Sequence, residues 1–121
     1  MREIATDSLC YINGKGYLAS PEGLIVPFTV TQISSTSARI VAMSPISQSL
    51  HYKVKITFHA MLGSHAFAGT GVVSKKEKNP FSTSLVYSLK FVKLPATKRH
   101  EIEDILALER IYQETPYSEF T

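Results

Sequence analysis

Gln32-Ile33-Ser34-Ser35-Thr36-Ser37-Ala38-Arg39-Ile40 is the most informative segment of this sequence. It predicts the end of one strand, a tight turn of Ser and Thr residues, and the start of a second strand. Residues 24–33 before the turn and residues 38–43 after it are rich in Val, Ile and Thr, which favour strands. The sequence therefore predicts two neighbouring strands joined by a polar turn.

Further strands are predicted on both sides of this turn. Residues 51–58 and 85–91 alternate strictly between two faces, as half-buried strands do. Their inward residues would be Tyr52, Val54, Ile56 and Phe58 in the first segment, and Leu85, Tyr87, Leu89 and Phe91 in the second. Residues 67–74 predict a strand with a bend or bulge at its glycines. Residues 10–18 predict a weaker strand, interrupted by a hairpin turn at Asn13-Gly14 with Lys15 at its tip.

Turns and a change of period complete the predicted architecture. Residues 20–23 form a typical β-turn sequence, and residues 44–47 and 75–80 are predicted to be polar loops. Six short strands at even spacing predict a mainly β fold, a small antiparallel β-barrel. After Pro95 the apolar period becomes helical, which predicts a C-terminal α-helix capped by Thr97 and ending near Glu114. We expect a single domain over residues 1–115 and a short tail over 116–121.

Composition and cysteine content narrow the class of protein. The chain has 121 residues, of which 44% are hydrophobic and 19% charged, so it is predicted to be globular and to bury a core. Its single cysteine, Cys10, has no intramolecular partner, and we expect it to be a small buried residue in a reducing compartment. Because no signal-peptide pattern and no membrane-spanning apolar run is present, the predicted location is the cytoplasm.

Charge is distributed unevenly along the chain. Residues 23–100 contain ten Lys or Arg and one acid, whereas residues 101–121 contain six acids and one Arg. Such asymmetry can indicate an anionic ligand or an acidic partner. The alternative is that the two ends of the chain compensate each other or that these charges simply solvate their faces.

Catalytic and metal motifs are absent from the sequence. His59 and His65 have no Cys or acid close by, whereas zinc sites use three or four ligands. Gly69-Thr70-Gly71 lacks the Gly-Lys-Ser/Thr of a phosphate-binding loop, and no nucleophile-elbow sequence occurs. We therefore expect no enzymatic activity, no catalytic residues, no metal and no cofactor.

The order of the turn, the later strands and the closing helix resembles the PilZ domain, a bacterial six-stranded barrel that usually binds cyclic di-GMP. The family turn has Asp or Asn, any residue, Ser, two residues and Gly. Here Ser34 matches, Gln32 replaces the Asp or Asn, and Ser37 replaces the Gly. Residues 88–91, in a late strand, and residues 98–102, at the helix start, also resemble the family in the type and order of their residues. The resemblance covers most of residues 8–110.

The family's first signature, Arg-x-x-x-Arg, precedes the first barrel strand, and its two guanidinium groups bind the dinucleotide. Upstream of Gln32 this chain has only Arg2 and Lys15. Lost arginines and an altered turn would remove several charge-assisted bonds of roughly 1.5–3 kcal/mol each. The resemblance to degenerate family members that act in type IV pilus assembly implies a bacterial adaptor in motility or surface attachment. It would contact a signalling or pilus or flagellar assembly protein, with weak or no cyclic di-GMP binding.

Candidate contact residues follow from this interpretation and its alternatives. The apolar stripe of the helix is predicted to pack on the barrel, and it consists of Ile102, Ile105, Leu106 and Ile111. If the helix is apolar over more than this stripe, Leu108, Ile111 and Tyr112 are the residues that would contact a partner protein. The first alternative is a true cyclic di-GMP receptor with a variant site. Its nucleotide contacts would be Lys15, Gln32, Ser34, Ser37 and Arg39.

Two further alternatives have less support. One is a nucleic-acid-binding barrel, for which salt-sensitive RNA or DNA retention is predicted. Such a platform needs exposed aromatic residues, whereas Tyr52, Phe58, Tyr87 and Phe91 alternate onto the inward face. Core packing accounts better for these side chains, so no nucleic acid is expected as a partner. The other is that Gln32–Ile40 is only a polar turn in an unrelated barrel.

Overall fold

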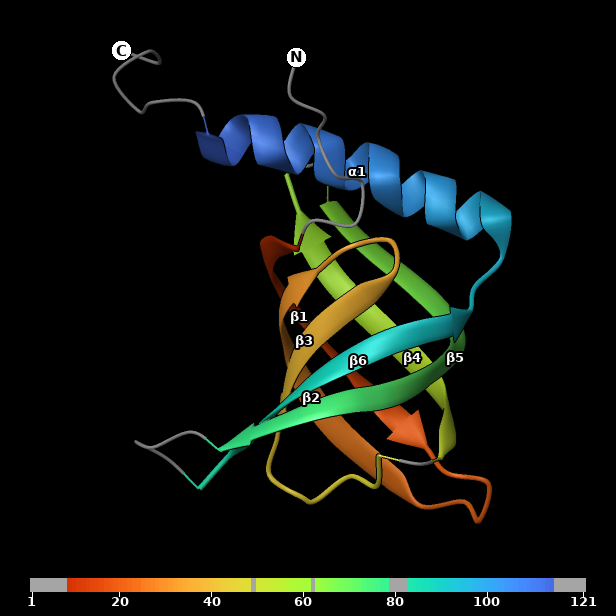
Figure 1. Ribbon diagram of the computed structural model, residues 1–121. Helices are drawn as coiled ribbons and strands as arrows, with labels where there is room; N and C mark the ends of the chain where they lie inside the picture. Colours follow the sequence, from red (N-terminus) through yellow and green to blue (C-terminus); the bar gives the residue numbers. More distant parts are fainter. Residues whose placement is uncertain (1–8, 49, 62, 79–82, 115–121) are drawn as a thin grey trace.

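The computed structural model describes residues 9–48, 50–61, 63–78 and 83–114. It contains six strands followed by one helix (Figure 1). The elements are β1 (Cys10–Ala19), β2 (Ile25–Ile33), β3 (Ser37–Ala42), β4 (His51–Ala60), β5 (Gly63–Lys78), β6 (Leu85–Lys93) and α1 (Ala96–Glu114). The predicted mainly β fold with a C-terminal helix is confirmed.

The strands close into a barrel in the order β1-β2-β3-β6-β5-β4, and every neighbouring pair is antiparallel. Alternate residues of each strand point into the barrel, because successive side chains of a strand lie on opposite faces. The predicted inward residues of β4 are all buried, and so are Tyr87, Leu89 and Phe91 of β6. Inside the barrel, Phe67 contacts both Phe58 and Phe91 edge to face, with centroid distances of 6.4 and 5.4 Å.

Strand β1 differs from the prediction. It is continuous from Cys10 to Ala19 and pairs with β4 as well as β2, so Asn13-Gly14 is not a hairpin turn and Lys15 is not at a tip. Its register against β2 shifts between Tyr11 and Gly14. Gly14 and Gly16 allow β1 to lie close to β4, because neither has a Cβ. A Cβ on Gly14 would lie 2.9 Å from Phe58 Cβ, and one on Gly16 would clash with the backbone oxygen of Lys55.

Strand β5 is longer than predicted. It extends to Lys78, so residues 75–78 belong to a strand, while residues 79 and 80 of the predicted loop lie outside the described residues. The predicted irregularity is confirmed, since the register against β6 shifts between Thr70 and Gly71 and again between Val73 and Lys75. The turn at residues 20–23 is also confirmed, with Gly23 at a φ of 91°.

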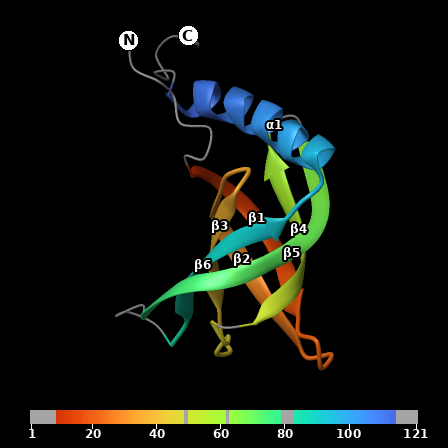
Figure 2. The same cartoon turned by 45° about the vertical axis from the view of Figure 1, so that its right-hand side comes forward.

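Helix α1 lies across one end of the barrel (Figures 1 and 2). It begins at Ala96, so Thr97 lies within its first turn and is not the cap; the Arg99 N–H donates to Pro95 O at 3.0 Å. Ile102, Ile105 and Leu106 are buried, as the predicted apolar stripe requires, but Ile111 is 63% exposed. The end near Glu114 agrees with the prediction, and the predicted tail at 116–121 lies outside the described residues.

A buried carboxylate fixes this helix to the barrel. Glu109 is 8% exposed and shares the helix face of Ile102, Ile105 and Leu106. Its Oε1 accepts a hydrogen bond of 2.7 Å from the backbone N–H of Met61, just after β4. The contact therefore connects α1 to the β4–β5 connection, and it places one acid of the C-terminal segment in a structural role.

Candidate functional site

The turn between β2 and β3 is built around the side chain of Ser34, which is fully buried. Its Oγ accepts hydrogen bonds from the backbone N–H groups of Thr36 and Ser37 at 3.2 and 3.1 Å. The same oxygen lies 3.2 Å from the Thr36 hydroxyl and 3.3 Å from the Ser37 hydroxyl. Because a hydroxyl offers one donor and two lone pairs, these contacts use the hydrogen-bonding capacity of the Ser34 side chain within the turn.

Backbone bonds hold the turn closed and attach it to the barrel. The Ser34 N–H donates to Ser37 O at 2.8 Å, and the Phe91 N–H of β6 donates to Thr36 O at 2.8 Å. Among the described residues, no residue other than glycine has a positive φ, so Ser37 needs none of the conformational freedom of a glycine. The sequence Ser-x-Thr-Ser is thus a self-contained structural turn in this chain.

Gln32 and Arg39 face one another across β2 and β3, beside this turn. The Arg39 side chain, however, extends over β6 toward β5, where its Nη2 lies 3.4 Å from Glu77 Oε1. Both side chains are about half-exposed, so the ion pair is worth less than about 1 kcal/mol. It nevertheless directs the guanidinium away from Gln32.

Lys15 lies apart from the other four residues. It is opposite Thr29 of β2, whereas Gln32 is three residues further along that strand and pairs with Tyr11. At about 3.3 Å per residue this separates Lys15 from Gln32 by roughly 10 Å. The structure therefore brings Gln32, Ser34 and Ser37 together at the turn, directs Arg39 elsewhere, and places Lys15 on the side of the barrel.

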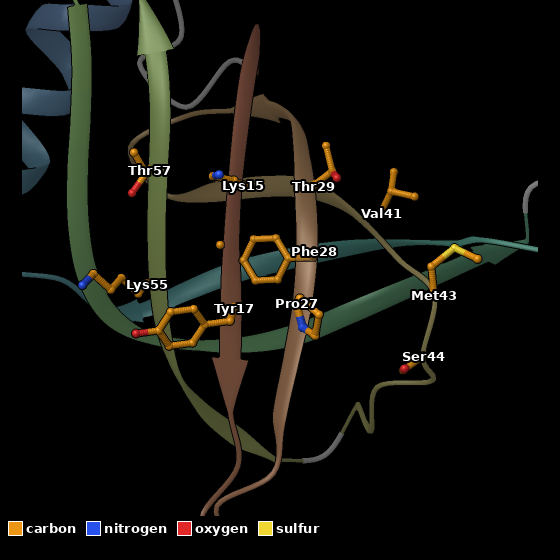
Figure 3. Close-up of a pocket in the computed structure, with 11 residues that line it drawn as sticks. Lys15, Tyr17, Pro27, Phe28, Thr29, Val41, Met43, Ser44, Lys55 and Thr57 are labelled. Carbon is orange, nitrogen blue, oxygen red and sulfur yellow. The ribbon is translucent and has the colours of Figure 1, made fainter.

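Lys15 instead lines a pocket of about 640 Å³ on the outer wall of β1, β2, β3 and β4 (Figure 3). We call it the wall pocket. It is lined by Lys15, Gly16, Tyr17, Pro27, Phe28, Thr29, Val41, Met43, Ser44, Lys55 and Thr57. Two cations and no acid are among these residues. The sequence does not predict this pocket, because a hairpin at Asn13-Gly14 would interrupt the strand that carries Lys15 and Tyr17.

The predicted partner-binding residues lie together on one exposed face of α1. Leu108, Ile111 and Tyr112 are 42%, 63% and 54% exposed, and their spacing of three and four residues places them on one side of the helix. This apolar face is separate from the buried stripe that packs on the barrel.

The histidines and the cysteine considered in the sequence analysis contact neighbouring side chains or are buried. His59 Nδ1 lies 2.6 Å from the Ser64 hydroxyl, and the His65 ring lies 5.6 Å from the ring of Phe58. In the described part of the chain no cluster of three or more His, Cys, Asp or Glu is placed to hold a metal. Cys10 is buried, as predicted. Within the same residues, no helix has both the length and the apolar composition of a membrane span.

Replacing Ser34 with alanine tests whether this residue has a structural role. We expect the free energy of unfolding to fall by about 1–2 kcal/mol in nucleotide-free buffer, because the Thr36 and Ser37 N–H groups lose their acceptor. Urea denaturation measures the change. Ser44→Ala, at an exposed position, is the matched control and should have little effect. An unchanged stability in Ser34→Ala would contradict the structural role.

Two solved structures share this architecture. The inhibitor of motility MotI/DgrA of Bacillus subtilis superposes with a TM-score of 0.68 at 10% identity, over 95% of this chain and 54% of that chain. This chain thus spans about half the length of MotI/DgrA. The PilZ domain of YcgR from Escherichia coli, solved with c-di-GMP, gives a TM-score of 0.54 at 14% identity, over 84% and 86% of the two chains.

No protein-family model and no curated protein matches the sequence. The barrel, its strand order and the C-terminal helix nevertheless give this chain a PilZ-like fold, as the turn sequence predicted. At these identities the likeness concerns the fold.

Proposed function

We propose that this chain is a non-enzymatic bacterial adaptor in motility or surface-attachment signalling. It acts in the cytoplasm through contact with a signalling or pilus or flagellar assembly protein, and it binds cyclic di-GMP weakly or not at all. The PilZ-like fold supports the pathway, because one structural neighbour is an inhibitor of motility and another was solved with c-di-GMP.

The observation that carries the proposal is the internal bonding of the β2–β3 turn. Ser34 Oγ is engaged by Thr36 and Ser37, and Arg39 is paired with Glu77. Residues 1–9, which come before β1, contain no Arg-x-x-x-Arg. A dinucleotide with two phosphates would find few free charge-assisted donors at this turn, and such bonds dominate the recognition of phosphates.

The exposed face of α1 supports protein contact. A surface of Leu, Ile and Tyr on one helix side suits contact with another protein, since the buried core of an interface is apolar and Tyr is one of the residues that contribute most to binding energy. Leu108, Ile111 and Tyr112 are the proposed partner-binding residues.

Capture from a bacterial lysate tests this role of the helix. The immobilised chain should retain a motility or pilus component, identified by mass spectrometry, with or without cyclic di-GMP. The variant Leu108→Ser/Ile111→Ser/Tyr112→Ser should lose it by tenfold or more, since hot-spot residues each contribute about 2 kcal/mol.

The control variant is Leu24→Ser/Ile25→Ser, which removes exposed apolar side chains at the β1–β2 hairpin. This hairpin lies at the end of the barrel opposite α1 (Figure 1). It should retain the partner. Equal capture by the helix variant and the control would place the partner surface elsewhere, and a partner retained only with cyclic di-GMP would favour the receptor alternative.

A further inference from the structure

We propose that the wall pocket is a binding site for a small planar aromatic anion, an aromatic ring that carries a phosphate or a carboxylate. The site is distinct from the β2–β3 turn and does not depend on the proposed protein contact of α1. Its volume of about 640 Å³ lies within the range of about 300–1,000 Å³ that small-molecule sites occupy.

One row of side chains across the pocket is arranged for an anionic group. Strand register places Lys15 directly between Thr57 of β4 and Thr29 of β2. Neighbouring side chains in such a row are about 5 Å apart at Cβ, so an ammonium and two hydroxyls are close enough to donate to one oxyanion. Within the described residues none of these three side chains has a hydrogen-bond or ion-pair partner.

The next row offers apolar surface for a ring. Tyr17 lies opposite Pro27 of β2, and Met43 follows β3 on the far side of the pocket (Figure 3). Tyr17 and Met43 are 41% and 69% exposed, so their apolar surface is accessible to a ligand in this pocket. Two residues along a strand separate the rows by about 7 Å, which suits a ligand with a ring at one end and a charge at the other.

Charge favours the same class of ligand. Lys55 lies opposite Tyr17 on β4, so it is a diagonal neighbour of Lys15, roughly 7–8 Å away. The two ammonium groups repel one another at this distance, and no acid lines the pocket to compensate them. A bound anion would neutralise this pair, whereas an uncharged ring would leave it unchanged.

Titration by two-dimensional amide NMR tests the proposal with four probes: phenyl phosphate, benzoate, inorganic phosphate and phenol. Phenyl phosphate or benzoate at millimolar concentration should shift the amide signals of residues 15–17, 28 and 29. Inorganic phosphate and phenol should bind at least about tenfold more weakly, because each lacks half of the recognised chemistry. The stronger of the two aromatic anions identifies the acidic group.

Two lysine variants provide the comparison. Lys15→Gln should weaken binding of the better probe about tenfold, because one charge-assisted donor is lost. Lys90→Gln removes the same charge from an exposed position on β6, outside the pocket, and should leave binding unchanged. The proposal is overturned if neither aromatic anion shifts these amides, if phosphate alone binds equally well, or if Lys15→Gln and wild type bind alike.

Discussion

Replacing Gly16 with alanine is expected to lower the free energy of unfolding by about 3 kcal/mol. The new Cβ would clash with the backbone oxygen of Lys55 and lie 3.0 Å from Phe28 Cζ, so β1 and β4 must move apart. Seven pairs of residues form this part of the barrel, from Asn13 with His59 to Ala19 with Lys53, and no flexible side-chain end absorbs the clash with the Lys55 backbone. Urea denaturation of the two proteins measures the loss.

Gly23→Ala is the matched comparison. Gly23 has a φ of 91° but open space around its missing Cβ, so the substitution should cost only about 1 kcal/mol of backbone strain. An equal or smaller loss of unfolding free energy in Gly16→Ala than in Gly23→Ala would contradict the close packing of β1 on β4. It would support the hairpin turn predicted at Asn13-Gly14.

Replacing Glu109 with alanine is expected to cost about 2–3 kcal/mol of unfolding free energy. The carboxylate is buried and accepts a bond of 2.7 Å from the Met61 N–H, a charge-assisted contact that nothing else in the variant would replace. Amide hydrogen exchange should also show faster exchange of the Met61 N–H, because this donor loses its acceptor.

Glu101→Ala is the control for the loss of one acid from α1. Glu101 is exposed and forms an i,i+3 ion pair of 3.2 Å with Lys98, which is worth about 0.5 kcal/mol or less. Similar small losses in both variants would show that the Glu109 contact does not hold the helix to the barrel.

Much of the fold could be predicted because the alternation of β4 and β6 is strict. Tyr52, Val54, Ile56 and Phe58 lie inside the barrel as their spacing predicted, and the Ser-Thr turn joins β2 to β3. The error in β1 has a physical cause. Asn-Gly favours a tight turn in isolation, but here the missing Cβ of Gly14 is needed for packing beneath Phe58, a tertiary requirement that local sequence does not reveal.

The candidate site was predicted less completely. The sequence located Ser34 at the turn, but it could not reveal that the Ser34 oxygen is engaged by its own turn or that Arg39 pairs with Glu77, 38 residues away. The wall pocket depends on the register of four strands, which brings Lys15, Lys55 and Thr29 together from distant positions. In the sequence, only its helical spacing from Ile102 and Ile105 distinguishes Glu109 from the other acids of residues 101–121.

The barrel of this chain and its β2–β3 turn give different expectations for cyclic di-GMP binding. A PilZ-like barrel occurs in a protein solved with c-di-GMP, yet the turn of this chain uses its hydrogen-bonding groups internally. We assign the greater weight to the turn, because a ligand is bound by the groups that are free to contact it and not by the barrel that carries them.

Isothermal titration calorimetry of the full chain with cyclic di-GMP tests that choice most directly. We predict no measurable heat of binding, or an affinity far weaker than micromolar. We also predict the same result for Arg39→Ala, because the Arg39 guanidinium is directed toward Glu77. Micromolar or tighter binding would contradict the proposed adaptor role. Its loss in Arg39→Ala would favour a cyclic di-GMP receptor with a variant site.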